Sequence, residues 1–297
     1  MVVAKPRGVR GPRGKLGSTT TGVSTMSDFN RNVTTTQYGT TAGQTVAVDA
    51  GLRAYMLHVY NYMVIGLAIT GFAALGIYML SITNDPTQAA KVMRGGAEVA
   101  ARISANTYLT TLGYTLFVGP VKWVLFLAPL AMVFVLSFGI QRMRPATAQL
   151  MFWLFAALIG LSLGSIFMVY THTSITRVFF ITAASFGALS LWGYTTQRDL
   201  SGMGSFLIMG MFGVLLAMLV NVFLQAPMLQ WIISIVGVLV FSGLTAYDTQ
   251  RLKSEYLYGA MDGETTERSA IVGALSLYLN FINLFTFLMQ LLGTREE

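Results

Sequence analysis

The stretch of this sequence that most clearly carries chemistry is "YDTQ", Tyr247–Gln250, where an apolar run ends at the carboxylate of Asp248. Acidic residues at membrane depth usually face a bundle interior or a wet cavity, and they often mark ion or proton paths. The alternative is an ordinary helix-end residue at the membrane interface, close to Arg251 and Lys253. A carboxylate is disfavoured at the negative carboxyl end of a helix dipole. We therefore expect either that another group stabilises Asp248 or that its helix continues.

A later apolar segment, "SAIVGALSLYLNFINLFTFLMQ", supplies possible partners for this acid. Its small and polar residues recur every three or four positions, so they form one stripe along a helix. In lipid, unpaired amides would each cost on the order of several kcal/mol. The stripe should thus face protein or water, and its helix should be surrounded by others. Helix packing alone explains such a stripe equally well, but two amides well inside the segment, with an acid nearby, favour an ion or proton path. The stripe comprises Ser269, Gly273, Ser276, Asn280, Asn283, Thr286 and Gln290.

Other kinds of chemistry find little support in the sequence. The chain has no Cys, which excludes disulfides and thiolate sites, and its two histidines, His58 and His172, lie far apart. A zinc site would need further ligands that the sequence does not offer. No Ser–His pair or second membrane carboxylate offers a nucleophile and base for a hydrolase. We expect no enzyme activity and no cofactor.

The elements that position these residues follow from composition. Apolar residues make up 54% of the 297 residues and charged residues only 10%. Soluble domains average about 25% charged residues, and a membrane helix needs about 20 mostly apolar residues. Seven blocks meet that length, so we predict an all-α integral membrane protein with seven transmembrane helices. The blocks are approximately Tyr55–Leu80, Pro120–Ile140, Ala146–Tyr170, Ile175–Tyr194, Ser205–Leu224, Met228–Tyr247 and Ala270–Leu292.

Charge sets the expected topology. Residues 1–53 hold seven basic and two acidic side chains, are rich in Thr, Ser and Gly, and lack apolar periodicity. We predict that they form a disordered, cytoplasmic basic tail, followed by the transmembrane domain at 54–297. Such a tail beside a membrane favours contact with anionic lipid over nucleic acid, which we do not expect as a partner. Basic residues in alternate loops then place the amino terminus inside and the carboxyl terminus outside.

Two motifs resemble a known family. "SGLTAYDTQRLK" followed by "ALSLYLNFINLFTFLMQLLG" is similar to the signature of the Bax-inhibitor family, the transmembrane Bax inhibitor motif proteins. The resemblance covers approximately residues 50–293 and is closest to the bacterial members. It implies a fold of seven helices with the seventh enclosed by the other six, in the bacterial inner (plasma) membrane. It also implies a pH-sensitive calcium leak channel or transporter, although some bacterial members are instead described as binding and restraining a membrane-bound protease.

The resemblance also implies roles for particular residues. An acidic pair on the sixth and seventh helices senses protons in the family, and an arginine at the end of the second helix latches the closed form. Asp248 matches the sixth-helix acid, and Arg142 in "GIQRMRP" matches the arginine better than Arg144 does. The seventh-helix acid of "LYLDF" is Asn280 here, in "LYLNF". This chain departs from the family at that position.

The departure has a physical consequence. Two carboxylates about 4 Å apart repel by roughly 4 kcal/mol at an effective dielectric constant of 20, which would keep one proton bound near neutral pH. Asn280 removes that repulsion and can donate to an ionised Asp248. We therefore expect a cation leak, with calcium as the transported ion, whose pH response is weakened or displaced below neutrality. Asp248 with amide oxygens would bind calcium only weakly and transiently. The alternative is a non-transporting regulator of a membrane protease or another partner.

Overall fold

The computed structural model describes residues 29–94, 97–104, 107–259 and 263–296. The chain divides into two units, Met1–Ala47 and Val48–Glu297. Helix α1 spans Phe29–Ser81 and so begins upstream of the predicted boundary at residue 53, in a stretch where the sequence predicts disorder. Residues 1–28 of the predicted tail lie outside the described residues. The architecture below is that of the unit Val48–Glu297.

Most of this unit is helical. Proline opens two of the helices, Pro145 in α4 and Pro227 in α8, at positions where its missing N–H is harmless. Between α7 and α8, Gln225 adopts a left-handed conformation with φ of 49°, which ends α7. The helices after α1 are α2 (Thr111–Phe117), α3 (Lys122–Gly139), the 3₁₀ helix η1 (Ile140–Arg142), α4 (Pro145–Leu163), α5 (Ile166–Val169), α6 (His172–Thr195), α7 (Ser201–Leu224), α8 (Pro227–Tyr258) and α9 (Gly263–Leu292).

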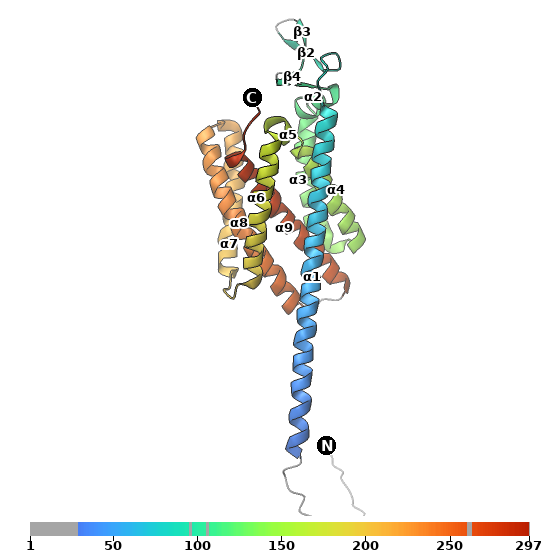
Figure 1. The fold of residues 1–297 in the computed structure, drawn as a ribbon, viewed down its shortest axis with the longest axis vertical. Helices are drawn as coiled ribbons and strands as arrows, with labels where there is room; N and C mark the ends of the chain where they lie inside the picture. The colour runs from blue at the N-terminus through green and yellow to red at the C-terminus, as the bar shows by residue number, and fades with distance from the viewer. Residues whose placement is uncertain (1–28, 95–96, 105–106, 260–262, 297) are drawn as a thin grey trace, which may run out of the picture. The chain divides into compact units, whose positions relative to one another are not determined.

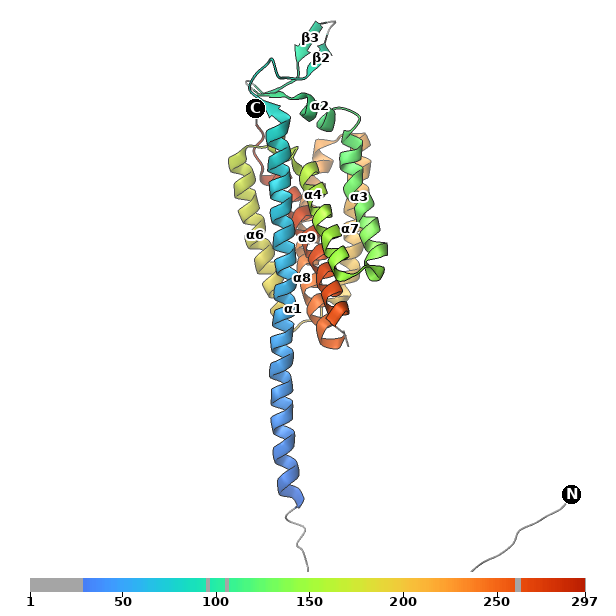
Figure 2. The ribbon, with the colours of Figure 1, turned by 90° about the vertical axis from the view of Figure 1, so that its right-hand side faces the viewer.

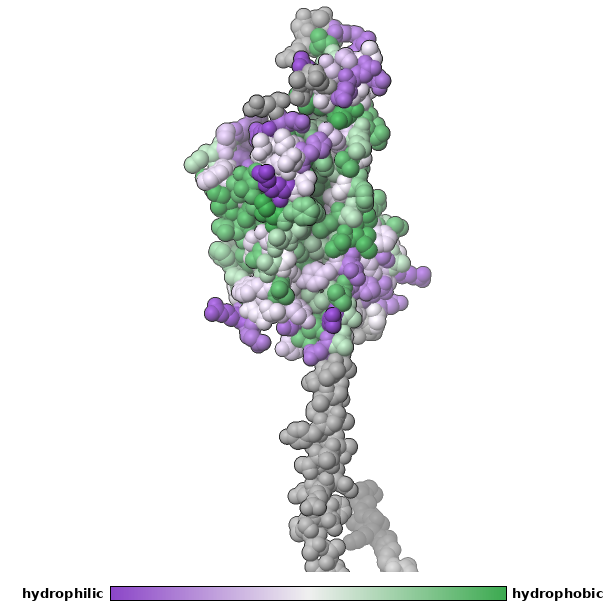
Figure 3. Space-filling model, in the orientation of Figure 1, coloured by the Kyte–Doolittle hydropathy of each residue, from purple (hydrophilic) through white to green (hydrophobic). Residues whose placement is uncertain are grey.

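These helices are suited to crossing a membrane. Six stretches of the described chain are long and apolar enough, namely Asp49–Ser81, Pro145–Val169, His172–Thr195, Ser201–Leu224, Pro227–Tyr258 and Gly263–Leu292. A seventh crossing is obtained if α2 and the start of α3, bent by 56°, form one broken span. Figure 3 shows hydrophobic side chains forming a band across the visible face, with hydrophilic side chains on both sides of it. The chain is an integral membrane protein, as predicted, and the count of seven stays a prediction.

The connection between α1 and α2 contains strands. Strands β1 (Ile82–Thr83), β5 (Thr107–Leu109) and β4 (Arg102–Ser104) form one antiparallel sheet in that order. Strands β2 (Lys91–Arg94) and β3 (Ala97–Ala100) pair with each other. Ala90, Ala101 and Leu109 form a small apolar cluster of their own. This segment therefore has a small core of its own. The candidate membrane spans are all helices, as the predicted all-α fold requires.

Helix α9 is the centre of the unit. In its most apolar stretch 67% of the residues are buried, against 39% or less in every other candidate span. Figures 1 and 2 show α9 running through the middle of the group formed by α1, α4, α6, α7 and α8. The absence of a side chain at Gly237 lets α8 approach α9, because a Cβ there would lie 2.6 Å from the ring of Phe287. The prediction that the polar-striped helix is surrounded is confirmed.

The segment after α9 is bound to the connection between α5 and α6. The backbone N–H of Thr171 donates to the carbonyl of Thr294 at 3.0 Å, and that of Glu296 donates to the carbonyl of Val169 at 3.0 Å. The N–H of Thr294 donates to the hydroxyl of Ser174 at 2.9 Å. The end of the central helix is thereby held against two of its neighbours.

Candidate functional site

Asp248 lies inside a helix rather than at its end. Helix α8 continues past it to Tyr258, which corrects the predicted end of the sixth span at Tyr247. The carboxylate therefore avoids the unfavourable negative end of the helix dipole. Asp248 is only 5% exposed, so its carboxylate is buried between α8 and α9. Asp248 is therefore not a helix-end residue, as one of the two alternatives set by the sequence would have it, but a buried acid within α8.

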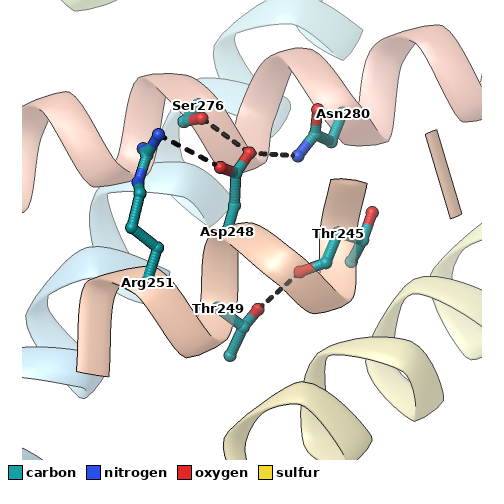
Figure 4. A network of polar contacts seen from close by, with 6 residues as sticks. All are labelled: Thr245, Asp248, Thr249, Arg251, Ser276 and Asn280. Carbon is teal, nitrogen blue, oxygen red and sulfur yellow. Dashed lines mark hydrogen bonds and ion pairs between the residues drawn. The ribbon is translucent and has the colours of Figure 1, made fainter. Parts of the chain in front are cut away.

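Two side chains of α9 donate to this carboxylate. Oδ2 of Asp248 accepts from the hydroxyl of Ser276 at 2.8 Å and from Nδ2 of Asn280 at 2.7 Å (Figure 4). Both donors belong to the predicted stripe and lie one helical turn apart. Hydrogen bonds to an ionised group are roughly twice as strong as those between neutral groups. Both bonds join the buried acid of α8 to the central helix, and the predicted contact between Asp248 and Asn280 is present.

Arg251 supplies the positive charge at this site. Its Nη1 lies 3.4 Å from Oδ1 of Asp248, in an i,i+3 ion pair on α8 (Figure 4). The Arg251 side chain is 42% exposed, so solvent screens the pair and it contributes about 0.5 kcal/mol or less. From the sequence, Arg251 is expected only as a residue close to Asp248 in the helix-end alternative. Its three-residue spacing from the acid, on a helix that continues, is the signal that would have identified it.

The predicted latch residues lie elsewhere. Arg142 ends η1 and Arg144 is the N-cap of α4, and both side chains are exposed. Within the described parts of the chain, the ion pair of Asp248 is with Arg251 and not with either of these. The structure therefore does not bring Arg142 or Arg144 to the carboxylate, and a latching role for them stays a prediction.

The rest of the stripe divides into three groups. Ser269 bonds the hydroxyl of Tyr55 on α1 at 3.1 Å, and Gln290 accepts from Ser234 at 2.7 Å and from Gln230, both on α8. Gly273 is buried against Leu252 of α8. Two members, Asn283 and Thr286, donate to carbonyl oxygens of their own helix. The prediction that the stripe faces protein holds for most of its length, with the pairing to Asp248 confined to Ser276 and Asn280.

A hydrogen-bonded chain that the sequence does not predict lies beside the acid. Thr249, the neighbour of Asp248, donates to the carbonyl of Thr245 at 2.8 Å and contacts the hydroxyl of Ser190 on α6 at 2.9 Å. Ser190 in turn bonds the hydroxyl of Tyr60 on α1. These hydroxyls lie on three different helices, so spacing along any one helix cannot reveal them.

The site offers little to a resident metal. Across the described residues no group of three or more His, Asp, Glu or Cys side chains could hold an ion. At Asp248 one carboxylate stands alone, and the two neighbouring groups of α9 present donors to it. Calcium prefers six to eight oxygen ligands. Among the described residues, the site therefore presents one carboxylate held by two donors, without a set of ligands for a resident ion.

Comparison with known proteins agrees with the two carboxyl-terminal motifs. Residues 52–297 match the family described as "Inhibitor of apoptosis-promoting Bax1". An uncharacterized protein of Caulobacter vibrioides is 40% identical over 92% of this chain and all of its own length. The uncharacterized protein RP147 of Rickettsia prowazekii is 39% identical with the same coverage. The Escherichia coli protein named "Inner membrane protein YbhL" is 42% identical over 83% of this chain and 94% of its own length.

Proposed function

Because this chain belongs to the Bax-inhibitor family of membrane proteins, we propose that it is a pH-sensitive cation leak, with calcium as the ion, that passes ions along α9 beside Asp248. One observation carries the proposal: a carboxylate that is 5% exposed joins two membrane-spanning helices through side chains of the central one. A buried acid in a membrane costs free energy and is usually retained for function. No enzyme activity and no cofactor form part of the proposal.

The geometry suggests how the path opens. In the described structure Ser276 and Asn280 hold Asp248 from one side and Arg251 holds it from the other. A cation can approach the carboxylate only when these contacts loosen. Protonation of Asp248 removes the charge that attracts both Arg251 and the cation. A single carboxylate binds calcium weakly, which suits passage better than storage.

The remaining parts of the proposal concern location and regulation. The relative from Escherichia coli is named an inner membrane protein, and we place this chain in the same membrane, with a cytoplasmic amino terminus and an external carboxyl terminus. Arg142 and Arg144, being exposed, would reach Asp248 only in another conformation. We retain them as candidates for a latch in that conformation, and Arg251 as the partner in this one.

Calcium flux into liposomes that contain the purified chain tests the proposal. We expect Asp248→Asn to lower the flux at least about tenfold, which corresponds to about 1.4 kcal/mol in barrier height. The control is Asp199→Asn, because Asp199 is an exposed acid in the connection between α6 and α7, and its flux should be unchanged. In the Asn280→Asp variant, the flux should depend steeply on pH around neutrality. Equal flux from the Asp248 and Asp199 variants would rule the proposal out.

The alternative is a regulator that binds a membrane protease or another membrane protein without transporting ions. It predicts the opposite pattern, in which flux never exceeds that of protein-free liposomes while deletion of residues 1–50 abolishes binding of the partner. Two measurements on the same purified protein, first of calcium flux and then of partner binding, therefore distinguish the two functions.

A further inference from the structure

A large groove lies between α1 and α6, and Asp248 is not among the residues that line it. Its volume is about 1110 Å³. One wall is formed by α1 between Asp49 and Leu75, and the other by α6 between Phe179 and Tyr194. Phe281 of the central helix lies at its floor. Figures 1 and 2 show α1 and α6 side by side and running in opposite directions.

The groove opens toward the bilayer. Its walls lie within the candidate membrane spans Asp49–Ser81 and His172–Thr195. Side chains on both walls are strongly exposed, among them Val64 at 60% and Phe72 at 77% on α1 and Leu191 at 64% on α6. Such a surface is apolar along most of its length, and in a membrane it is covered by apolar groups. A lipid acyl chain has the chemistry and the shape to fill it.

One end of the groove carries a pair of opposite charges. Asp49 and Arg53 both line it and both are exposed. They are four residues apart on α1, so their side chains lie on one helical face about 5–6 Å apart at Cβ. Among the ion pairs between described residues, none involves either side chain. An arginine fits a phosphate well, and a carboxylate beside it fits an ammonium group.

We propose that this groove binds one bilayer phospholipid whose headgroup carries both a phosphate and an ammonium, as phosphatidylethanolamine does. The phosphate pairs with Arg53, the ammonium pairs with Asp49, and an acyl chain lies along the apolar walls toward Leu75. An anionic lipid such as phosphatidylglycerol fits less well, because it offers nothing to Asp49. This binding site is independent of the proposed ion leak.

The residues that line the groove are linked to those around the buried acid, although Asp248 itself does not line it. Phe281 at the floor follows Asn280 directly in the sequence, and Ser190 in the wall bonds Thr249, the neighbour of Asp248. Tyr60, also in the wall, bonds Ser190. The bound lipid would therefore contact α1 and α6 at Tyr60 and Ser190, two residues of the hydrogen-bonded chain described above.

Native mass spectrometry of the full chain tests the site, with phosphatidylethanolamine and phosphatidylglycerol of identical acyl chains added in increasing amounts. The groove-filling variant is Gly187→Trp, because Gly187 lines the groove and a Cβ there meets nothing within 4 Å. The matched control is Gly213→Trp on α7, where a Cβ also meets nothing within 4 Å, but which does not line the groove. We expect one saturable phosphatidylethanolamine per chain, bound at least about tenfold more weakly by Gly187→Trp and equally well by Gly213→Trp.

The headgroup assignment has its own variants on the exposed face of α1, where misfolding is not expected. Asp49→Asn should abolish the preference for phosphatidylethanolamine over phosphatidylglycerol, and Arg53→Gln should weaken both lipids. The proposal is overturned if the two tryptophan variants bind lipid alike, or if the chain has no preference between the lipids. It is also overturned if a second copy of the chain fills the groove, seen as a dimer cross-linked between cysteines placed at Val64 in this Cys-free sequence.

Discussion

Replacing Asn280 by alanine removes the shortest hydrogen bond to Asp248. The bond is 2.7 Å long and both residues are 5% exposed. Hydrogen bonds between helices in a membrane average about 0.6 kcal/mol, whereas bonds to charged groups contribute about 1.5–3 kcal/mol. Because the acceptor here is a carboxylate with an arginine beside it, the second range applies. We expect Asn280→Ala to lower the free energy of unfolding by about 1.5–3 kcal/mol.

The same helix provides the control. Asn283 is also an asparagine of the stripe, but its amide donates only to the carbonyl of Leu279 on its own helix, at 2.8 Å. We expect Asn283→Ala to cost about 0.6 kcal/mol or less. Unfolding in mixed micelles of a mild detergent and dodecyl sulfate measures both variants under one protocol.

A double-mutant cycle isolates the contact itself. Combining Asn280→Ala with Asp248→Ala should cost less than the sum of the single changes, by a coupling energy of about 1.5 kcal/mol or more. A coupling energy below about 0.5 kcal/mol, or equal losses in the Asn280 and Asn283 variants, would show that the bond does not stabilise the acid. The structural basis of the proposed function would then be lost.

Two further predictions concern packing and pH. Gly193→Ala should destabilise the bundle by about 1–3 kcal/mol, because its Cβ would lie 2.3 Å from the carbonyl oxygen of Ala246 on α8. Gly187→Ala, on the same helix with nothing within 4 Å, should change stability by less than about 1 kcal/mol in the same unfolding assay. Hydrogen bonds from the backbone and hydroxyl of Thr87 hold the pKa of Asp85 below its ordinary value. The ionised form therefore stabilises the fold at neutral pH, and that contribution should disappear as the pH falls through the lowered pKa. Thermal unfolding followed against pH should show the wild-type advantage over Asp85→Asn shrinking on acidification, and a constant difference would contradict the assignment.

Much of the site follows from periodicity. The spacing of Ser276 and Asn280 on α9 placed both on one face, and the cost of leaving amides in lipid required that this face meet protein. Asp248 was the one acid available, so its contact with Asn280 could be predicted. The central position of α9 follows from the same argument.

What periodicity missed has physical reasons. Most residues after Tyr247 are polar, so hydropathy predicts that the span ends there. Helix α8 nevertheless continues to Tyr258, with Leu252 buried against α9. The pairing of Arg251 with Asp248 depends on that continuation. The strands between residues 82 and 109 are two to four residues long, too short to produce a recognisable alternation. The chain from Thr249 through Ser190 to Tyr60 joins three helices, and only their packing brings it together.

The central helix follows the other membrane spans in chain order. During synthesis the earlier helices therefore enter the membrane before the segment that fills their common interior has left the ribosome. Until α9 arrives, Asp248 lacks Ser276 and Asn280, and the inward faces of its neighbours must be covered by lipid or by an insertion factor. The helix that fills the interior is therefore made only after the spans that surround it.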